Sequence, residues 1–442
     1  MLFKFLKYLQ PTHYFQCYTN TGKSIFPIAE NLPEEVISKL TMDEGFISKQ
    51  ARAYDLSWQA VQKGYIGNVA TYTSFTEVDI QDNYHFIRKY FNKAWVFYVL
   101  ILRLLSFKNP FKEINSWYKT RNVSRVQINN VNLYDVDYKS FQSSLIERNP
   151  KVSVVIPTLN RYTYLKDVLL DLEQQDYKNF EVIVVDQSDA FNEAFYKDFK
   201  LHLNIIQQQE KALWLARNNA IKNAKGEFIA LSEDDVRIKQ DWISSHLKCL
   251  DYFNAQVSAG VFYPKGGQIP EARSFFAVAS QFATGNAMLY KSVFKTVGLF
   301  DRQFEKQRMG DGEFGMRLYL EELKSVSNPL ASCVDVKAGT GGLREMGSWD
   351  AFRPSNFFAA RPIPSVLYYF RTYFGNASAR LALLRTIPIS IFPYQFKKNK
   401  PLLLIGLVVT ILILPIVIFQ VSKSWYLSSK KLKEGALIES LV

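Results

Sequence analysis

Three consecutive acidic residues, Glu233-Asp234-Asp235, follow an apolar segment that is predicted to be a buried strand over residues 227–231. Adjacent carboxylates repel one another unless a cation lies among them. Carboxylate oxygens at the end of a strand are suitable ligands for Mg²⁺ or Mn²⁺, and such an ion can in turn hold a diphosphate. A solvent-exposed acidic loop is the simpler alternative, because acidic loops are common.

The segments around this cluster predict an α/β domain with a mostly parallel, Rossmann-like sheet flanked by helices. One such helix is indicated over residues 165–172 by apolar residues at helical spacing. Parallel sheets bind their ligands beyond the carboxyl ends of the strands, which is where Thr158, Asn160, Asp186 and the acidic cluster fall. The four predicted strands are 151–157, 180–186, 203–206 and 227–231.

Seven short segments resemble, in order, the motifs of family 2 glycosyltransferases, which have the GT-A fold. The resemblance covers roughly residues 150–335. It implies a metal-dependent, inverting transfer of a sugar from a nucleotide-sugar donor, of the hexosyltransferase type. The donor-side segments are 154–161, 182–189, 216–218 and 233–235, and the acceptor-side segments are 285–288, 297–301 and 310–315.

The resemblance assigns roles within the acidic cluster. Asp235 matches the metal-binding aspartate of the family, so Mg²⁺ or Mn²⁺ is the expected cofactor. Glu233 stands where the family usually has an aspartate, and its longer side chain still offers oxygen ligands for the metal. Asp234 is expected to contact the nucleotide ribose or the sugar rather than the metal.

Four further residues are expected to bind the donor. Asp186 matches a strand-end aspartate that contacts the nucleotide base, although a helix N-cap or a turn would also explain it. Thr158 and Asn160 are expected beside the nucleoside, and Asn160 is equally suited to cap a helix. Arg217 matches an arginine near the nucleotide and its diphosphate, with a solvent-exposed helix arginine as the alternative.

Asp311 is the expected general base, which would deprotonate the acceptor hydroxyl. The family pattern at this place is Glu-Asp, whereas this chain has Gly310-Asp311, so only the aspartate is kept. An acid in the first turn of a helix is also favoured electrostatically, which is the alternative reason for Asp311. Glu313 is the next candidate for the base.

Residues 402–421 form an uncharged apolar run with the length of a transmembrane helix, followed by a short tail over 422–442. Pro415 is tolerated inside such a helix. The lysines on the two sides of the run are too balanced to orient it. Because nucleotide sugars are cytoplasmic substrates, we expect a single-pass protein of the cell inner (plasma) membrane whose catalytic domain faces the cytoplasm.

The flanking regions are expected to be accessory. Residues 1–145 are predicted to be mostly helical, and the apolar segment 95–105 is short enough to favour a buried or interfacial helix over a span. Residues 336–400 are predicted to form a loop and an amphipathic, membrane-proximal region. In it, Arg344 is a candidate diphosphate contact, and 361–374 would lie on anionic headgroups or pack on the sheet domain. The net charge of +13 fits a membrane surface.

Two other functions stay open. A nucleotidyltransferase would need a glycine-rich, lysine-containing loop after the first strand, which residues 158–162 do not provide. A catalytically inactive GT-A-like membrane scaffold is compatible with the departures at Glu233 and Gly310. The expected acceptor is a lipid-linked or polysaccharide glycan. Nucleic acid is not an expected partner, because basic and aromatic residues do not form a known binding module.

Overall fold

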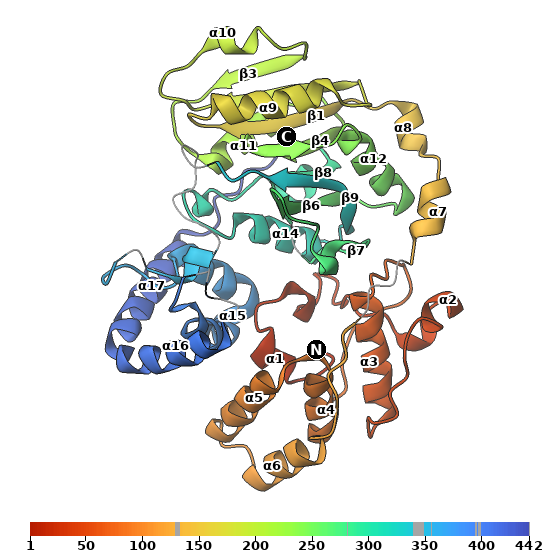
Figure 1. Ribbon diagram of the computed structural model, residues 1–442, viewed down its shortest axis with the longest axis vertical. Coiled ribbons are helices and arrows are strands. Elements are labelled where there is room, and N and C mark those ends of the chain that lie inside the picture. The colour runs from red at the N-terminus through yellow and green to blue at the C-terminus, as the bar shows by residue number, and fades with distance from the viewer. Residues whose placement is uncertain are drawn as a thin grey trace. The chain divides into compact units, whose positions relative to one another are not determined.

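The structure is a computed structural model that describes residues 1–128, 133–280, 282–338, 349–354, 356–393, 396 and 399–441. The chain forms two compact units (Figure 1). The helical unit comprises residues 1–133 and 370–412, and the sheet unit comprises residues 134–369 and 413–442.

The sheet unit is built on a single sheet, in which the described residues form nine strands. Their order is β3-β2-β1-β4-β8-β6-β9-β5, and β7 pairs with β9. β1 and β2 are parallel and in register from Val152 opposite Phe180 to Thr158 opposite Asp186, so both end at the same edge. The strands are β1 Val152–Thr158, β2 Phe180–Asp186, β3 Leu203–Gln207, β4 Phe228–Ser232, β5 Val236–Ile238, β6 Val257–Pro264, β7 Ala277–Val278, β8 Asn286–Tyr290 and β9 Ser325–Asp335.

Helices connect many of these strands along the chain (Figure 1). The first helix after β1 buries Leu165, Val168, Leu169 and Leu172 completely, which confirms the helix expected from their spacing. The helices of the sheet unit are α7 Asp135–Ser140, α8 Ser144–Arg148, α9 Tyr162–Glu173, α10 Glu193–Tyr196, α11 Leu213–Asn223, α12 Trp242–Tyr252, α13 Val293–Val297, α14 Gly310–Leu320 and α17 Leu414–Glu434.

The sheet is mixed, which differs from the mostly parallel sheet that we expected. β3, β2, β1 and β4 are parallel to one another, as predicted. However, β8 pairs antiparallel with both β4 and β6. Residues Asn286–Leu289 of β8 are buried in succession, the pattern that is typical of a parallel strand. Its direction therefore could not be inferred from its sequence.

The helical unit is built around aromatic side chains and buried ion pairs. Phe3 stacks on Phe86 with 3.9 Å between the ring centroids. Lys89 lies 2.7 Å from the buried Asp55, which also accepts a hydrogen bond from Tyr90, so the buried charges compensate one another. The helices are α1 Leu6–Leu9, α2 Glu34–Ile37, α3 Lys49–Gln62, α4 Ile80–Tyr90, α5 Lys93–Leu105, α6 Pro110–Lys119, the part of α15 (Pro364–Thr386) after residue 369, and α16 Lys400–Leu412.

The apolar run over 402–421 forms two helices rather than the single helix that we expected. It is divided between α16 and α17, and Pro415 lies in the first turn of α17, where the ring of a proline fits a helix best. Among the described residues, no single helix is long and apolar enough to cross a bilayer, whereas α16 and α17 together meet that criterion as a bent pair.

The segment 361–374 contributes to α15, which is interrupted at Gly375 by non-helical backbone angles. Within the sheet unit, Val366 and Leu367 are fully buried, and Tyr368 donates a hydrogen bond to Asp301 at 3.2 Å. This part of the segment therefore packs on the sheet unit, which is one of the two expected arrangements. The predicted diphosphate contact Arg344 lies outside the described residues.

Candidate active site

The acidic cluster after β4 is neutralised in part by an arginine that follows β1. Arg161 Nη1 lies 3.1 Å from Asp234 Oδ1 and 3.2 Å from Asp235 Oδ2. Asp234 is 4% exposed and accepts a hydrogen bond from Thr158 Oγ1 at 2.8 Å. Burial raises the pKa of Asp234 to about 6, Arg161 opposes that shift, and Asp235 adds to it. Asp234 thus belongs to the interior, whereas Glu233 and Asp235 are partly exposed.

Glu233 and Asp235 offer carboxylate oxygens to a metal ion, but they do not form a complete set of ligands. Within the described ranges, no three His, Cys, Asp or Glu side chains are placed to hold an ion together. Mg²⁺ needs only one or two protein carboxylates when waters and substrate phosphates complete its shell. Asp335, at the end of β9, lies nearby: burial raises its pKa, and Asp235 and Glu233 raise it further. A divalent cation would relieve this concentration of negative charge, so the residues fit one.

Asp186, the last residue of β2, accepts three hydrogen bonds. The hydroxyls of Tyr162 and Tyr196 donate to Oδ2 at 2.6 and 2.7 Å, and the backbone N–H of Ser188 donates to Oδ1 at 2.9 Å. The bond from Ser188 is that of a turn aspartate. A turn alone does not account for the hydrogen bonds from the two tyrosines, which fix the orientation of the Asp186 carboxylate at the strand end.

Asn160 joins two loops at the same edge of the sheet. Its Nδ2 donates to Asp189 Oδ2 at 2.7 Å, and the backbone N–H of Asp189 donates to Asn160 Oδ1 at 3.0 Å. The N-cap position of α9 is occupied by Arg161, whose side chain makes no cap. The capping alternative for Asn160 is therefore wrong.

Arg217 connects the acidic cluster to Asp311. Its side chain is fully buried, which excludes a solvent-exposed arginine. Nη1 donates to Thr284 Oγ1 at 2.6 Å, and Nη2 lies 3.7 Å from Glu233 Oε1. The Thr284 hydroxyl in turn donates to Asp311 Oδ1 at 2.5 Å. Because a guanidinium can only donate, the direction of both hydrogen bonds is fixed, and the hydroxyl proton of Thr284 must point to Asp311.

Asp311 lies in the first turn of α14 but its side chain does not cap that helix. Met309 holds the N-cap position, without a side-chain hydrogen bond. The carboxylate of Asp311 is half-buried and is bound at Oδ1 by the hydroxyl and, at 3.4 Å, by the backbone N–H of Thr284. The tertiary partner of Asp311 is thus Thr284, from the segment that leads into β8.

Two glycines make room for this arrangement. A Cβ atom on Gly285 would lie 2.7 Å from Cδ of Glu233, and one on Gly310 would lie 2.3 Å from Cζ2 of Trp214. The Trp214 ring therefore fills the place where a side chain at position 310 would begin. The departure of Gly310 from the Glu-Asp pattern has a packing cause.

Glu313, the second candidate for the base, is bound to Arg317. Arg317 Nε and Nη2 lie 2.8 and 2.9 Å from the two carboxylate oxygens of Glu313, which is 2% exposed. Arg317 also donates to the backbone carbonyl of Leu299 at 3.0 Å. The pair holds the loop before α14, so Asp311 is the more accessible acid.

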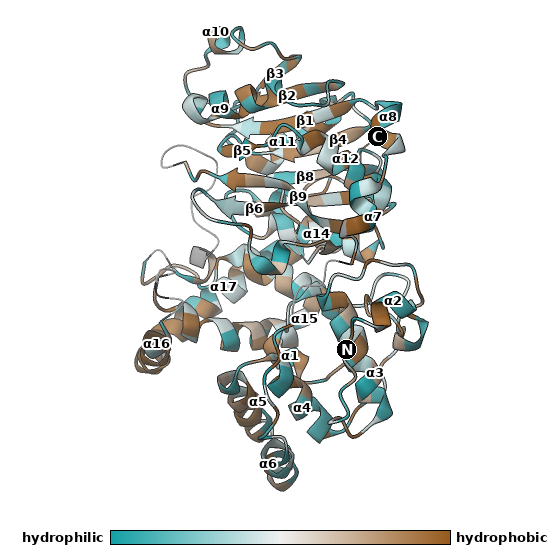
Figure 2. Cartoon of the chain, turned by 45° about the vertical axis from the view of Figure 1, so that its right-hand side comes forward, coloured by the Kyte–Doolittle hydropathy of each residue, from teal (hydrophilic) through white to brown (hydrophobic). Residues whose placement is uncertain are grey.

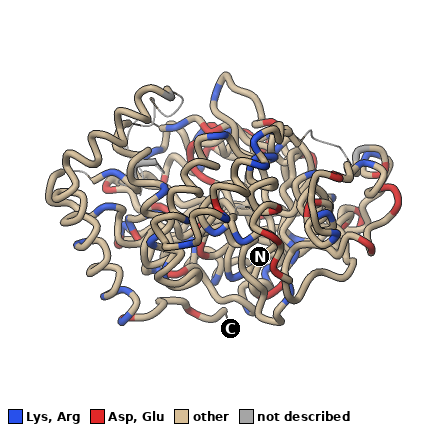
Figure 3. The backbone as a smooth tube through the Cα atoms, turned by 90° about the horizontal axis from the view of Figure 1, so that it is seen from below, with Lys and Arg blue, Asp and Glu red and all other residues tan. Residues whose placement is uncertain are grey.

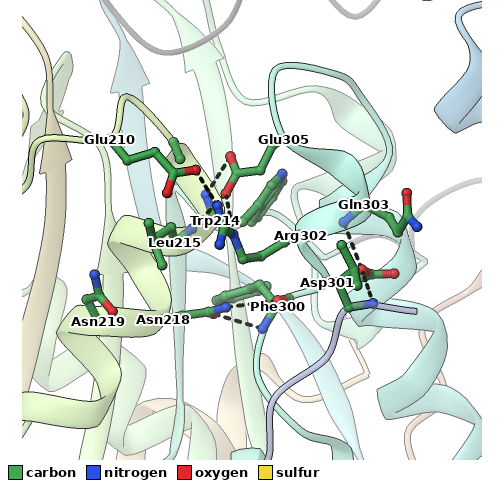
Figure 4. Close-up of polar contacts among 12 residues, drawn as sticks. Glu210, Trp214, Leu215, Asn218, Asn219, Phe300, Asp301, Arg302, Gln303 and Glu305 are labelled. Carbon is green, nitrogen blue, oxygen red and sulfur yellow. Dashed lines mark hydrogen bonds and ion pairs between the residues drawn. The ribbon is translucent and has the colours of Figure 1, made fainter. Parts of the chain in front are cut away.

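The start of α11, which carries Trp214 and Arg217, is held by the loop over residues 300–305 (Figure 4). Glu305 accepts hydrogen bonds from the backbone N–H groups of Trp214 and Leu215 at 3.2 and 2.8 Å. The side chain of Asn218 exchanges two hydrogen bonds of 2.9 Å with the backbone of Phe300. The N-terminus of α11 is thus already bonded to a carboxylate of the protein.

The predicted residues lie in one unit and fall into connected groups. Thr158, Asp234 and Asp235 gather around Arg161, whereas Glu233 and Asp311 are joined through Arg217 and Thr284. Asp186 and Asn160 lie at the neighbouring strand end. Sequence reasoning assigned no role to five residues of the site: Arg161, Tyr162, Thr284, Tyr196 and Asp335. Arg161 lies inside a recognised motif, and Tyr162 and Thr284 directly adjoin one.

Comparisons with known proteins find a matching family and several similar glycosyltransferases. Residues 153–310 match the family described as Glycosyl transferase family 2. Glycosyltransferase GlyA of Streptococcus pneumoniae serotype 4 is 26% identical over 163 residues, which cover 36% of this chain and 22% of GlyA. The GalNAc(5)-diNAcBac-PP-undecaprenol beta-1,3-glucosyltransferase of Campylobacter jejuni is 25% identical over 190 residues, which cover 39% of this chain and 61% of that protein.

Solved structures are similar at a lower level. The mannosyltransferase PcManGT of Pyrobaculum calidifontis, in complex with GDP-Man and Mn²⁺, has a TM-score of 0.43 and 15% identity, and the match covers 67% of this chain and 91% of that one. TarS 1–349 of S. aureus, in complex with UDP-GlcNAc, has a TM-score of 0.41 and 19% identity, with 63% and 81% covered.

The family match and the curated relatives thus make residues 153–310 similar to family 2 glycosyltransferases. The match contains the acidic cluster and ends one residue before Asp311. This chain spans only part of the curated relatives, 22% of GlyA and 61% of the Campylobacter protein.

Proposed function

We propose that the sheet unit is a GT-A-type, inverting hexosyltransferase that moves a sugar from a nucleotide-sugar donor to a lipid-linked or polysaccharide acceptor. The observation that carries the proposal is the connection from Asp311 through Thr284 and Arg217 to Glu233. It joins a candidate base to the acids that would face a diphosphate. The lipid-linked acceptor is supported by the name of the Campylobacter relative, which includes an undecaprenol-linked compound.

In this mechanism, Asp311 accepts the proton of the acceptor hydroxyl. Both hydrogen bonds from Thr284 end on Oδ1, so Oδ2 is the oxygen that we assign to the proton. The acceptor oxygen forms a bond to the anomeric carbon while the bond from that carbon to the diphosphate breaks. The nucleoside diphosphate leaves with the bonding electrons. One displacement of this kind inverts the anomeric configuration.

The leaving diphosphate carries negative charge that must be neutralised. We propose that Asp235 and Glu233 hold Mg²⁺ or Mn²⁺, which supplies that neutralisation when bound. Arg161 balances the same acids in the present structure, at 3.1 and 3.2 Å from Asp234 and Asp235. We propose that Arg161 would contact the diphosphate if Asp235 and Glu233 held the cation.

The donor residues divide by their position at the edge of the sheet. We propose that Asp186 and Asn160 contact the nucleoside, because both lie where β1 and β2 end. Thr158 and Asp234 would act beside them at the ribose or the sugar. The full burial of Arg217 supports a positioning role, in which it orients Glu233 and Thr284 behind the diphosphate.

For the whole chain we propose a location at the cytoplasmic face of the inner (plasma) membrane, with the apolar run over 402–421 as an anchor. The bent pair of α16 and α17 supports this only by length and composition. Residues 1–145 and 336–400 would serve as accessory and membrane-proximal regions around the catalytic domain at 150–335.

Donor binding tests the proposal directly. The full chain in detergent is titrated with a panel of nucleoside diphosphates and nucleotide sugars, with Mg²⁺ or Mn²⁺ and with excess chelator. At least one nucleotide should bind more tightly with the metal, and Asp235→Asn should remove that difference. Asp167→Asn is the matched control, because Asp167 is an exposed aspartate of α9, at 4.0 Å from Arg237. Binding that is equal with and without metal for every nucleotide would contradict the proposed cation.

A further inference from the structure

The hairpin of α5 and α6 in the helical unit exposes apolar side chains along both helices. On α5, Phe97, Ile101 and Leu105 recur at intervals of four and share one face. After α5 four more large apolar residues are exposed, and the last three of them recur at intervals of three and four along α6. They are Phe107, Phe111, Ile114 and Tyr118.

The tip of the hairpin is the most exposed part of this surface. Phe107 is 98% exposed and Phe111 is 85% exposed. Phe107 also has a positive φ of 53°, a backbone conformation that an aromatic residue seldom adopts. Soluble proteins rarely present contiguous apolar patches of this kind unless the patch binds something.

The inner side of the same hairpin is polar and rigidly held. Arg103 Nε donates to Glu113 Oε1 at 3.0 Å, and the hydroxyl of Tyr84 donates to Glu113 Oε2 at 2.9 Å. Arg88 donates to Thr120 Oγ1 at 3.0 Å and to the carbonyl of Trp117 at 2.8 Å. The hairpin therefore buries the acid Glu113 against Arg103 and leaves several large apolar side chains exposed, whereas the outer face of an ordinary surface helix is polar.

The exposed charges around the hairpin have one sign. Between residues 93 and 128 the only acid is Glu113, which is buried and paired with Arg103. All the other ionised side chains of this stretch, apart from Arg103, are exposed and basic: Lys93, Lys108, Lys112, Lys119, Arg121 and Arg125. A surface with aromatic and aliphatic residues between cations is complementary to a membrane interface with anionic headgroups.

A second helix of the same unit points to a lipid rather than a protein partner. α16 has no charge after Lys400 and exposes Leu404, Val408 and Ile411 among other apolar residues. Figure 2 shows hydrophobic colour along both α5 and α16. A bilayer can cover both helices without matching the shape of either. By contrast, Lys and Arg are spread along the whole chain (Figure 3), so the total charge alone does not single out this surface.

We propose that the α5–α6 hairpin is a membrane-docking surface that inserts Phe107 and Phe111 into the headgroup region of anionic bilayers. Lys108 and Lys112, next to these residues, would contact the lipid phosphates. This surface shares no residue with the acidic site of the sheet unit or with the run over 402–421. It would hold the helical unit against the bilayer whatever the sheet unit catalyses.

The test measures local contact, because another segment could anchor the full chain. In a Cys17→Ser background, Phe107→Cys carries an environment-sensitive fluorophore, and the full chain is added to phosphatidylcholine vesicles with or without phosphatidylglycerol. Some lipids bear a nitroxide quencher. The matched control is Ile37→Cys, at an exposed apolar residue of α2 in the same unit. No sugar substrate is needed, so the result is independent of the proposed glycosyl transfer.

With phosphatidylglycerol present, we expect the label at position 107 to be quenched several-fold more than the label at position 37. Adding Lys108→Glu and Lys112→Glu should reduce that quenching at least about threefold, as should high salt. A label at position 107 that stays unquenched would overturn the proposal and leave a protein partner as the occupant. Equal quenching without phosphatidylglycerol would overturn it as well, because the contact would then not depend on anionic lipid.

Discussion

The acidic site of the sheet unit and the hairpin of the helical unit place their charges in opposite ways. In the sheet unit, Glu233, Asp235 and Asp311 are partly exposed, and Arg217 and Thr284 connect Glu233 to Asp311. In the helical unit, Arg103 and Glu113 are buried against one another, and the hairpin exposes large apolar residues such as Phe107 and Phe111.

The difference shows what a buried charge can mean. Arg217 and Arg103 are both buried arginines beside a glutamate, but only Arg217 leads through Thr284 to a partly exposed aspartate. A buried pair that ends within the interior mainly fixes structure. A buried arginine that orients accessible carboxylates prepares a site for chemistry. Substitutions in both units test this distinction.

The largest effect is expected from Asp311→Asn. The amide keeps the volume of the side chain but cannot take the proton of the acceptor. We therefore expect sugar transfer to fall by about 100- to 10,000-fold at saturating donor and acceptor, while nucleoside-diphosphate binding stays near wild type. Turnover in a radiolabelled-sugar assay and donor affinity by calorimetry measure the two quantities.

Glu313→Gln is the matched control for that variant. It removes a neighbouring acid on the same helix, but one that is paired with Arg317, so it should lower stability more than turnover per folded molecule. If Asp311→Asn kept more than about a tenth of the wild-type turnover, another residue would have to be the base.

In the helical unit, Glu113→Gln should act on stability alone. It leaves the Arg103 guanidinium buried without its counter-charge, which typically costs about 3–5 kcal/mol. Hydrogen exchange of the amides of α5 and α6 would report this loss, and donor binding by the sheet unit should be unchanged. The double variant Arg103→Met, Glu113→Leu should recover most of the stability. A loss of donor affinity in Glu113→Gln would show that the Arg103–Glu113 pair is not purely structural and would contradict the contrast between the two units.

His246 tests whether the interior of the sheet unit is coupled to pH. It is fully buried, with Nδ1 at 2.8 Å from Ser258 Oγ and Nε2 at 3.1 Å from Asn286 Oδ1. Burial lowers its pKa from 6.5 to about 4. The unfolded chain therefore binds a proton between these values that the folded chain does not. Stability should be lost as the pH falls from about 6.5 to about 4, by up to about 3 kcal/mol.

His246→Gln isolates this contribution, because glutamine does not titrate. The variant should be less stable than wild type at pH 7, and the gap in the free energy of unfolding should narrow towards pH 4. Denaturant titrations at several pH values measure the gap. The variant is needed because burial lowers the pKa of His13, in the helical unit, to about 4 as well. A gap that stays constant with pH would assign the pH dependence to other groups.

The smallest effect is expected from Thr284→Val, which removes the hydroxyl between Arg217 and Asp311. The base then loses its orientation but not its carboxylate, so the rate constant for transfer should fall by roughly tenfold. Donor affinity should stay close to wild type, and Thr284→Ser should restore the rate. If Thr284→Ser were as slow as Thr284→Val, the methyl group and not the hydroxyl would matter.

The elements whose formation depends on residues close together in the sequence were predictable. The four strands β1 to β4 agree with the predicted runs to within about one residue at each end, and α9 buries the residues whose spacing indicated it. The direction of β8 was not predictable, because a strand buried on both faces has the same apolar pattern in either direction. The break of the apolar run at Ile413 also escaped prediction, since Pro415 is compatible with both a helix start and a helix interior.

For the site, the residue types and their positions at strand ends were evident from the sequence. The partners were not. Thr284 and Asp311 are 27 positions apart, and Arg217 and Thr284 are 67 apart. Such pairs are fixed by how β8, α11 and α14 pack together. The glycine at position 310, where the family pattern has glutamate, also has a tertiary cause: the Trp214 ring occupies the space that a side chain there would need.

The sequence by itself thus determined the class of domain, the strand-end acids and the candidate base, because local apolar patterns and short motifs encode them. Only the tertiary structure decided that Arg161 balances Asp234 and Asp235, that Thr284 holds Asp311, and that the α5–α6 hairpin turns its apolar side outward. These features depend on which side chains meet across long stretches of chain. These long-range contacts are determined by packing, burial and hydrogen bonding in the folded chain, and local sequence patterns do not predict them.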